Sequence, residues 1–183
     1  AGTLEPDDGR VTHRRGTTIG LLGQKDNLVD TDTVHHAVVG DTPEYEWASS
    51  PRTRQILAGL ISDVPWEGTV GELSGGQQRR VAFAGVLAME PEVLVLDEPV
   101  AGLDPLSREE FLGLIRELHA GGRTIVMVSH SMEDLAALSD RILVLSEGRV
   151  FRLGTPAEVF ADAAALKAVG LGAPAPEAFA ASL

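Results

Sequence analysis

Apolar residues along the chain fall into short unbroken runs and into stripes with helical spacing. The runs at 17–22, 93–96 and 124–128 predict strands, and the last two are typical of strands covered on both faces of a sheet. Between them, Asp104 opens a predicted helix whose apolar stripe stops at Gly121. Strands that alternate with helices predict a largely parallel sheet in a layered α/β domain.

Further predicted elements flank this alternation. Ser50-Pro51 has the pattern of a helix N-cap followed by proline at the first helical position. A short helix is predicted over 131–138. The runs at 141–145 and 149–153 flank a Ser-Glu-Gly turn and predict a β-hairpin.

The composition and the net charge of the chain argue against several classes of function. The 183 residues are 44% hydrophobic and 23% charged, which is typical of one globular domain. A net charge of −12 argues against a nucleic-acid-binding surface, and 4% aromatic residues argue against a base-stacking platform. The lack of cysteine excludes disulfides and thiolate metal sites. The longest apolar run, 81–89, is too short for a membrane helix, so we expect a soluble protein whose membrane role requires a partner.

Two predicted strands end in polar residues that could carry chemistry. Asp97 and Glu98 follow the run 93–96, and two carboxylates at a strand end suit Mg²⁺ coordination and proton acceptance from a water. The alternative is a strand that runs into a solvated loop. His130 closes the second segment, TIVMVSH, where it could bind a phosphate oxygen or orient a water. The alternative for a lone histidine is an ordinary surface or core position.

A third candidate site is the segment LSGGQQRR at 73–80. Ser74 followed by two glycines opens a predicted amphipathic helix, and the free N–H groups of such a helix start can bind an anion. The alternative is an N-capped helix after a glycine-rich turn. The pair His35-His36 suggests a metal site, but without cysteine or i, i+4 histidine spacing a solvated helix face is the better interpretation.

The order and spacing of these segments resemble the ATP-binding-cassette (ABC) ATPases. LSGGQQRR resembles the signature motif of that family, VLVLDEP its Walker B strand, AGLDP its D-loop and VSH its switch histidine. Gln24 is similar to the Q-loop glutamine, although by itself it would be taken as an exposed loop residue. Together these motifs span residues 17–130.

The resemblance implies a fold and a domain organisation. The expected fold is α/β, a P-loop NTPase-like (RecA-like) parallel sheet with an inserted helical subdomain at about 27–88. The nucleotide-binding domain is expected to cover 1–170, followed by a loosely ordered tail at 171–183. The sequence contains no G-x-x-x-x-G-K-[ST] Walker A motif, so we expect the domain to be partial and truncated at its N-terminal side.

The resemblance also implies a role for each matching residue. Asp97 holds Mg²⁺, Gln24 senses that ion and couples the site to a partner protein, and Glu98 polarises the attacking water. His130 contacts the γ-phosphate of ATP. Asp104 crosses the interface of a cassette dimer. The residues that close over the nucleotide of the second cassette are Ser74, Gly75, Gly76 and Gln77.

ATP and Mg²⁺ are therefore the expected nucleotide and metal ion. The expected partners are a second ABC cassette, in a homodimer or heterodimer, and a transmembrane transporter subunit. The chain itself is not expected to insert into the membrane. Its expected location is cytoplasmic, at the inner face of the cell membrane.

Three functions fit the resemblance. The first is the ATP-hydrolysing subunit of an ABC transporter, which the similarity of residues 81–183 to energy-coupling-factor and cobalt-type importer ATPases favours. The second is a partner without ATPase activity that supplies only its signature motif to another chain, which the missing Walker A motif favours. The third is a fragment of an ABC-F ribosome-associated factor, because residues 1–80 resemble ABC-F proteins. The acidity of the chain counts against this third function.

Overall fold

The structure is a computed structural model that describes residues 9–10, 12, 14–23, 28–172 and 174. The chain divides into two compact units, Ala1–Val128 and Ser129–Leu183. The domain expected over 1–170 spans both units, and most of the expected tail at 171–183 lies outside the described residues.

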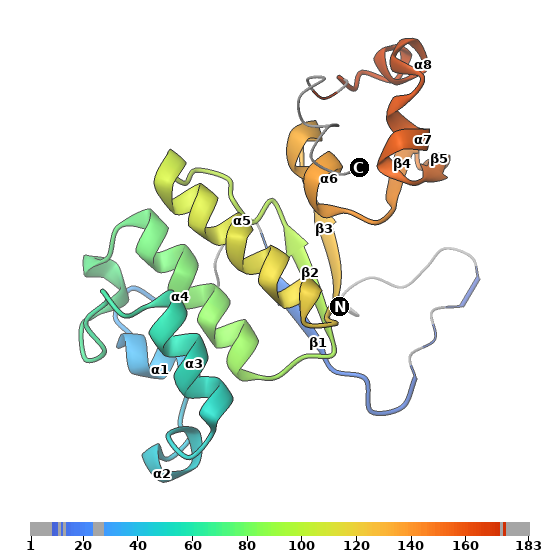
Figure 1. The fold of residues 1–183 in the computed structure, drawn as a ribbon. Coiled ribbons are helices and arrows are strands. Elements are labelled where there is room, and N and C mark those ends of the chain that lie inside the picture. Colours follow the sequence, from blue (N-terminus) through green and yellow to red (C-terminus); the bar gives the residue numbers. More distant parts are fainter. Residues whose placement is uncertain (1–8, 11, 13, 24–27, 173, 175–183) are drawn as a thin grey trace. The chain divides into compact units, whose positions relative to one another are not determined.

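The first unit is built around a three-stranded parallel sheet (Figure 1). The strands are β1 (Ile19–Leu22), β2 (Val93–Asp97) and β3 (Thr124–Val128), in the order β1-β2-β3. Their register places Leu22 opposite Leu96, and Leu96 opposite Met127. The three predicted strands and the parallel sheet are confirmed. All three carboxyl ends meet at one edge of the sheet, where ligands bind in α/β proteins.

Helices fill the segments between the strands of the first unit. Ser50 caps α3 (Pro51–Leu60) by accepting a hydrogen bond from the Thr53 N–H at 3.2 Å, as the Ser-Pro pattern predicts. The predicted helix after Asp104 is α5 (Pro105–Ala120), and the predicted helix after Ser74 is α4 (Gly75–Ala88). The helices in the described part of this unit are α1 (Val34–Val39), α2 (Glu44–Trp47), α3 (Pro51–Leu60), the 3-10 helix Val70–Glu72, α4 (Gly75–Ala88) and α5 (Pro105–Ala120).

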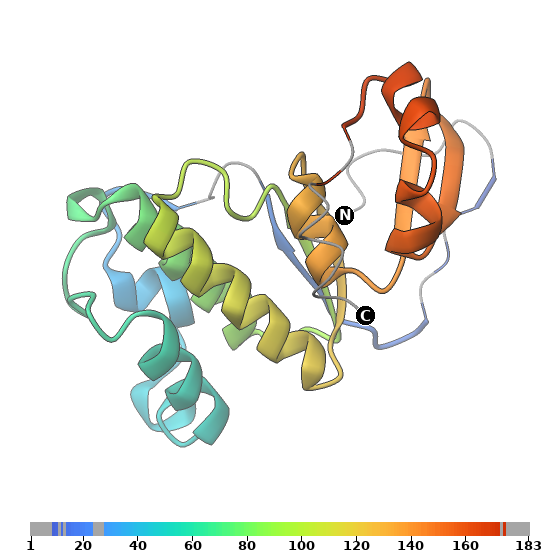
Figure 2. The same cartoon turned by 45° about the horizontal axis from the view of Figure 1, so that its top comes forward.

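Helices α4 and α5 lie on the same face of the sheet (Figures 1 and 2). They pack against each other through Phe83 and Phe111, whose ring centroids are 4.7 Å apart. Leu94 and Leu96 point to this face and are fully buried. On the opposite face, Leu21 is 53% exposed and Val126 is 51% exposed. The prediction of burial on both faces is therefore wrong for β3, whose Val126 and Val128 are exposed, whereas the outward side chains of β2 are half-buried.

Two glycines allow α4 to approach its neighbours closely. A Cβ on Gly20 of β1 would lie 2.6 Å from Val86 Cγ1 of α4, and a Cβ on Gly85 of α4 would lie 2.8 Å from the Ala37 carbonyl oxygen of α1. Both distances are shorter than real Cβ contacts, so only glycine fits at either position. Helix α4 is thus held tightly between β1 and α1.

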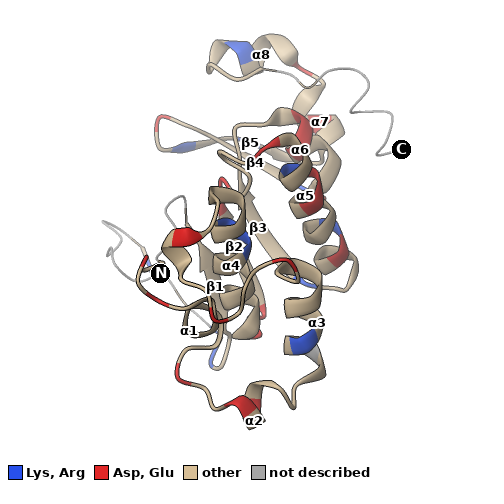
Figure 3. Cartoon of the chain, turned by 90° about the vertical axis from the view of Figure 1, so that its left-hand side faces the viewer, with Lys and Arg blue, Asp and Glu red and all other residues tan. Residues whose placement is uncertain are grey.

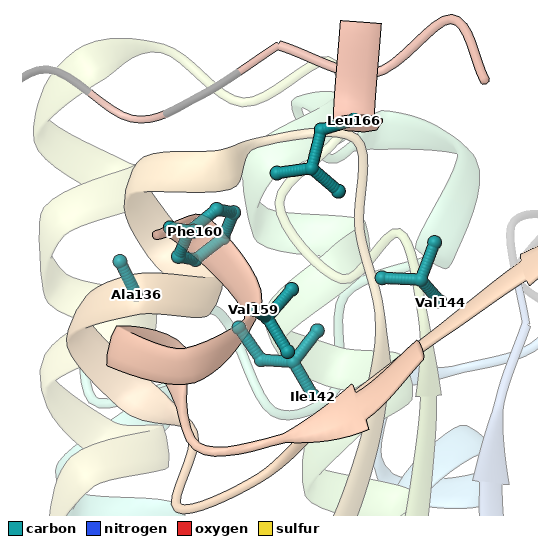
Figure 4. Close-up of a cluster of buried hydrophobic side chains, with 6 residues drawn as sticks. All are labelled: Ala136, Ile142, Val144, Val159, Phe160 and Leu166. Carbon is teal, nitrogen blue, oxygen red and sulfur yellow. The ribbon is translucent and has the colours of Figure 1, made fainter. Parts of the chain in front are cut away.

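The second unit has its own small apolar core. The predicted hairpin is formed by β4 (Ile142–Ser146) and β5 (Arg149–Gly154), with Glu147 and Gly148 at φ 49° and 72° in the turn. The remaining helices are α6 (Met132–Leu138), α7 (Pro156–Phe160) and α8 (Ala163–Ala168). Figure 4 shows the buried side chains that hold these elements together, which are Ala136, Ile142, Val144, Val159, Phe160 and Leu166.

The surroundings of two helical glycines predict that a glycine-to-alanine substitution destabilises the chain in α4 and stabilises it in α5. Gly85→Ala should lower the free energy of unfolding by about 1–3 kcal/mol, because the new methyl group meets a backbone oxygen that cannot move easily. Gly113→Ala in α5 should raise it by about 0.5–1 kcal/mol, because nothing lies within 4 Å of the added Cβ and alanine favours the helix. Urea denaturation of both variants measures the difference. Shifts in the same direction would contradict the close approach of α4 to α1.

Candidate functional site

The signature segment forms the capped start of α4. Ser74 is the N-cap, and its Oγ accepts a hydrogen bond from the Gln77 N–H at 3.3 Å. In return, Gln77 Oε1 accepts from the Ser74 N–H at 3.0 Å. This reciprocal pair is a capping box, which satisfies two backbone donors at the start of the helix. A Cβ on Gly75 would meet nothing within 4 Å, so a ligand or a partner can approach the backbone there.

The signature turn lies beside the start of α5. A Cβ on Gly76 would lie 3.3 Å from Ser107 Oγ and 3.9 Å from Asp104 Oδ2. Asp104 caps α5 by accepting hydrogen bonds from the N–H groups of Leu106 and Ser107, each at 3.1 Å. The hydrogen bond from the Ser107 side chain, helped by these backbone donors, lowers the pKa of Asp104. Asp104 therefore has a local structural role at this position.

The predicted carboxylate pair lies at the carboxyl end of β2. Asp97 is the last residue of the strand and is partly buried, and Glu98 follows it with 9% exposure. Glu98 has a φ of +47°, a left-handed conformation that costs a residue with a side chain about 1–2 kcal/mol. Its N–H donates to the Val128 carbonyl at 2.9 Å, which ties it to the end of β3. Strained backbone of this kind is concentrated at functional sites.

Arg79 is a residue at the site that sequence reasoning missed. It lies in α4, five residues after the N-cap, and is 4% exposed. Its guanidinium donates to carbonyl oxygens at the ends of β1 and β2. Arg79 precedes Phe83 and Leu87 at intervals of four residues, so it lies on the buried stripe of the helix. A charged residue at an apolar position of this stripe is the signal that could have identified it.

The neighbouring Arg80 contacts a different part of the unit. Its two terminal nitrogens donate to the two carboxylate oxygens of Asp63 at 2.6 and 2.8 Å, and one of them also donates to the Leu60 carbonyl at 2.8 Å. The hydrogen bond from Arg80 lowers the pKa of Asp63 from 3.8 to about 2. This bidentate pair attaches α4 to the end of α3.

The structure brings most of the predicted site residues together in the first unit. The signature turn, the carboxylate pair and Asp104 all belong to it, linked through Arg79 and through the packing of Gly76 against α5. Gln24 lies outside the described residues, and Gly23 directly before it is described. His130 is exposed and belongs to the second unit, two residues after the end of β3.

The donor atoms at the end of β2 fit a magnesium ion that is bound together with phosphate. Among the described residues, no group of three or more His, Cys, Asp or Glu side chains could hold a metal ion by itself. Mg²⁺ in phosphate sites takes one or two protein carboxylates and completes its shell with phosphate oxygens and waters. Asp97 and Glu98 supply two adjacent carboxylates, which matches that requirement.

The histidine pair lies away from these residues, in α1. His36 is exposed and faces Asp32 at 3.2 Å, as expected for a solvated helix face. His35 packs against Trp66 and Trp47, with ring centroids 5.2 and 6.0 Å away, so the solvated interpretation is wrong for this residue. Trp47 also lines a cavity of about 340 Å³ between α1, α2, α3 and the end of α4.

Neither a cluster of one charge sign nor a long apolar helix stands out in the described part of the chain. Figure 3 shows basic and acidic positions distributed over many elements of the described chain. No helix in the described part of the chain is long and apolar enough to span a membrane.

A parallel sheet with strand-end carboxylates, a capped signature turn and a capped α5 defines a cassette-type nucleotide-binding fold. A sequence profile of the family described as ABC transporter matches residues 1–101, more than half of the chain. The chain belongs to the ABC transporter family.

Relatives of the chain include energy-coupling factor transporter ATP-binding proteins named EcfA2. The one from Symbiobacterium thermophilum is 44% identical over 199 residues, covering 98% of this chain and 68% of the relative. The one from Clostridium tetani is 59% identical over 104 residues, covering 56% of this chain and 36% of the relative. The first match covers 98% of this chain and so includes nearly all of residues 1–80, the part for which the sequence suggested ABC-F proteins. The chain spans between 36% and 68% of the length of these two relatives.

Solved structures confirm the expected α/β P-loop NTPase-like fold. The structure of cbiO1 from Clostridium perfringens, described as part of the ABC transporter complex cbiONQ, is 35% identical with a TM-score of 0.66. The match covers 84% of this chain and 63% of that one. An inward-facing metal-chelate type ABC transporter has a TM-score of 0.78 over 92% of this chain and 69% of that one. Its identity is 20%, so that likeness concerns the fold alone.

The Arg80–Asp63 pair predicts a specific loss of stability in acid. The pKa of Asp63 is lower in the folded chain, so its contribution is complete above pH 4 and is lost as the pH falls from 3.8 towards about 2. Asp63→Asn should lower the free energy of unfolding by about 0.5–1 kcal/mol at pH 7, because the carboxylate is half exposed and solvent screens the pair. Denaturant unfolding at pH 7, 4 and 3 should show a smaller acid loss in the variant than in the parent. Identical pH profiles would mean that the pair contributes nothing.

Proposed function

We propose that the chain is part of an ATP-hydrolysing subunit of an energy-coupling-factor type ABC transporter. The subunit would bind ATP with Mg²⁺ and couple its hydrolysis to transport by a membrane partner. The observation that carries this proposal is the assembly, in one unit, of the signature turn, the carboxylate pair after β2 and the capped start of α5. The similarity to EcfA2 proteins along nearly the whole chain supports it.

Within this proposal the carboxylates have separate tasks. Asp97 would hold Mg²⁺, together with Gln24, and the bound ion would neutralise charge that develops on the phosphates. Glu98 would accept the proton of the attacking water, because it is largely buried and fixed by its backbone next to that carboxylate. His130, from the second unit, would contact the γ-phosphate.

The signature turn would act on the nucleotide of a second cassette. The open space at Gly75 and the free N–H groups at the start of α4 suit a phosphate that arrives from outside the chain. Gly76 and Gln77 would complete this contact, and Ser74 would change from its capping role to a ligand. Asp104, close to the same turn, would lie at the interface between the two cassettes.

The partners of the chain follow from the same similarity. The cbiO1 structure is described as part of the cbiONQ complex, and EcfA2 proteins are named as transporter subunits. We propose a second cassette, identical or different, and a transmembrane subunit as partners of this chain. Its location would then be the cytoplasmic face of the cell membrane, reached through the transmembrane subunit.

A second candidate function is to supply the signature turn to another ATPase without hydrolysis by this chain. The exposure of Ser74 and Gly75 favours it, because these groups are accessible to a partner's nucleotide. The 183 residues contain no G-x-x-x-x-G-K-[ST] segment of their own. Direct ATP binding distinguishes the two functions.

Titration calorimetry with ATP and Mg²⁺, followed by an ATPase assay, tests the first function. The parent chain should bind ATP and release phosphate. Glu98→Gln should retain ATP binding and lose turnover by about 10²–10⁴-fold, the usual contribution of a general base. Glu92→Gln is the matched control, because it removes an exposed carboxylate at the other end of β2, and its turnover should match the parent. No ATP binding by the parent would contradict ATP hydrolysis by these 183 residues, and full activity of Glu98→Gln would exclude Glu98 as the base.

A further inference from the structure

Arg79 places a positive charge inside the first unit. Its side chain is 4% exposed, and burying an ionised group is costly unless hydrogen bonds replace its water. Nε donates to the Pro99 carbonyl at 3.0 Å, and Nη1 donates to the Gly23 carbonyl at 2.6 Å. Nη2 donates to the carbonyls of Asp97 at 3.3 Å and Glu98 at 3.2 Å. Four backbone oxygens therefore converge on one guanidinium.

These four carbonyls share a position in the fold. Gly23 follows the last residue of β1, and Asp97 is the last residue of β2. Glu98 and Pro99 continue directly from β2. The carbonyls belong to the segments that leave the sheet at its carboxyl edge, where the strand ladder no longer supplies partners for every backbone group. Arg79 thus connects the ends of two neighbouring strands to helix α4.

The connection includes the strained residue. The left-handed φ of Glu98 persists only if its surroundings fix the backbone on both sides. The Val128 carbonyl accepts from its N–H, Ala101 N–H donates to its carbonyl at 3.1 Å, and Arg79 donates to the same carbonyl. Arg79 also holds the carbonyls before and after it, at Asp97 and Pro99.

We propose that Arg79 is a positioning residue that fixes the backbone of Glu98 and the ends of β1 and β2 in the conformation required for hydrolysis. This inference rests on the proposed ATPase function for its kinetic part. The planar guanidinium has five donors in a fixed arrangement, whereas a lysine ammonium has three donors at one point. A lysine at position 79 can therefore satisfy only part of this set of carbonyls.

The position of Arg79 on α4 adds a second consequence. Ser74 and Arg79 belong to the same helix, separated by little more than one turn. A movement of the signature turn would therefore shift the guanidinium that holds Glu98. Arg79 therefore couples two parts of the proposed site through α4. One is the signature turn, which would contact a second cassette, and the other is the Glu98 carboxylate, which would act on water.

The test compares Arg79→Met and Arg79→Lys with a matched control, Arg123→Met. Arg123 donates to the carbonyl of Pro91, two residues before β2 begins, so its variant also removes a guanidinium–carbonyl hydrogen bond, but at the opposite end of that strand. Turnover is measured as kcat and KM for ATP. Hydrogen–deuterium exchange is measured at the amides of Glu98 and Ala101, whose bonds report the local conformation.

Arg79→Met should lower kcat by about 10²-fold with little change in KM, because a misplaced catalytic group weakens the chemical step more than substrate binding. Hydrogen–deuterium exchange at Glu98 and Ala101 should accelerate at least about tenfold relative to the amides of α5. The reason is that amides exchange when their hydrogen bonds open locally, and these bonds would open more often without Arg79. Arg79→Lys should recover part of both effects. Arg123→Met should keep the kcat of the parent and leave exchange at Glu98 unchanged.

Equal exchange at Glu98 in the parent and in Arg79→Met would overturn the proposal, as would a kcat loss of the same size in Arg123→Met. If Arg79→Met does not fold, the Lys variant decides, because unchanged exchange and unchanged kcat in that folded variant would also overturn it. Absence of turnover in the parent would instead refute the proposed ATPase function. The exchange measurement would still test the positioning role in that case.

Discussion

The close approach of α4 to its neighbours is the constraint on which the first unit depends. Glycines at 20 and 85 bring the helix within backbone distance of β1 and α1, and its buried stripe then covers the sheet. Because the same helix begins with the signature turn, this packing also decides where that turn lies. The arginine pair that follows the turn fixes the helix in two directions, inwards to the strand ends and outwards to Asp63.

The site combines regular helices and strands with one residue, Glu98, in a strained backbone conformation. One capping box, an aspartate N-cap and ladder hydrogen bonds satisfy the backbone donors and acceptors of the elements around Glu98. Among the described site residues, Glu98 alone has a left-handed backbone with a side chain, and several independent hydrogen bonds hold it there. A carboxylate fixed in this way loses little freedom when a reaction begins, which is the advantage of a preorganised group.

Much of the fold could be predicted because local chemistry determined it. Ser50 and Asp104 cap their helices as their side chains suggest, and the Glu147-Gly148 turn closes the hairpin between two apolar runs. The order of motifs identified the family. The burial of the strands could not be predicted, because runs of valine and leucine do not say how many faces a neighbouring helix covers.

Three details around the site could not be predicted from the sequence. The spacing of Arg79 from Phe83 and Leu87 indicates that it points inwards, but the carbonyl groups that it meets depend on the packed position of α4. The backbone conformation of Glu98 and the aromatic packing around His35 arise from contacts between distant segments. Propensity at single positions contains no information on such contacts.

The exposed apolar side chains of the sheet have a consequence for how copies of this chain behave in solution. Leu21, Val126 and Val128 lie exposed on one face, and β3 is an edge strand among the described strands of its sheet. Such surfaces promote association through strand pairing and apolar contact. A net charge of −12 keeps copies apart by electrostatic repulsion at neutral pH. Near the isoelectric point of about 4.7 that repulsion disappears while the apolar face remains, so colloidal stability of the chain is set by its carboxylates.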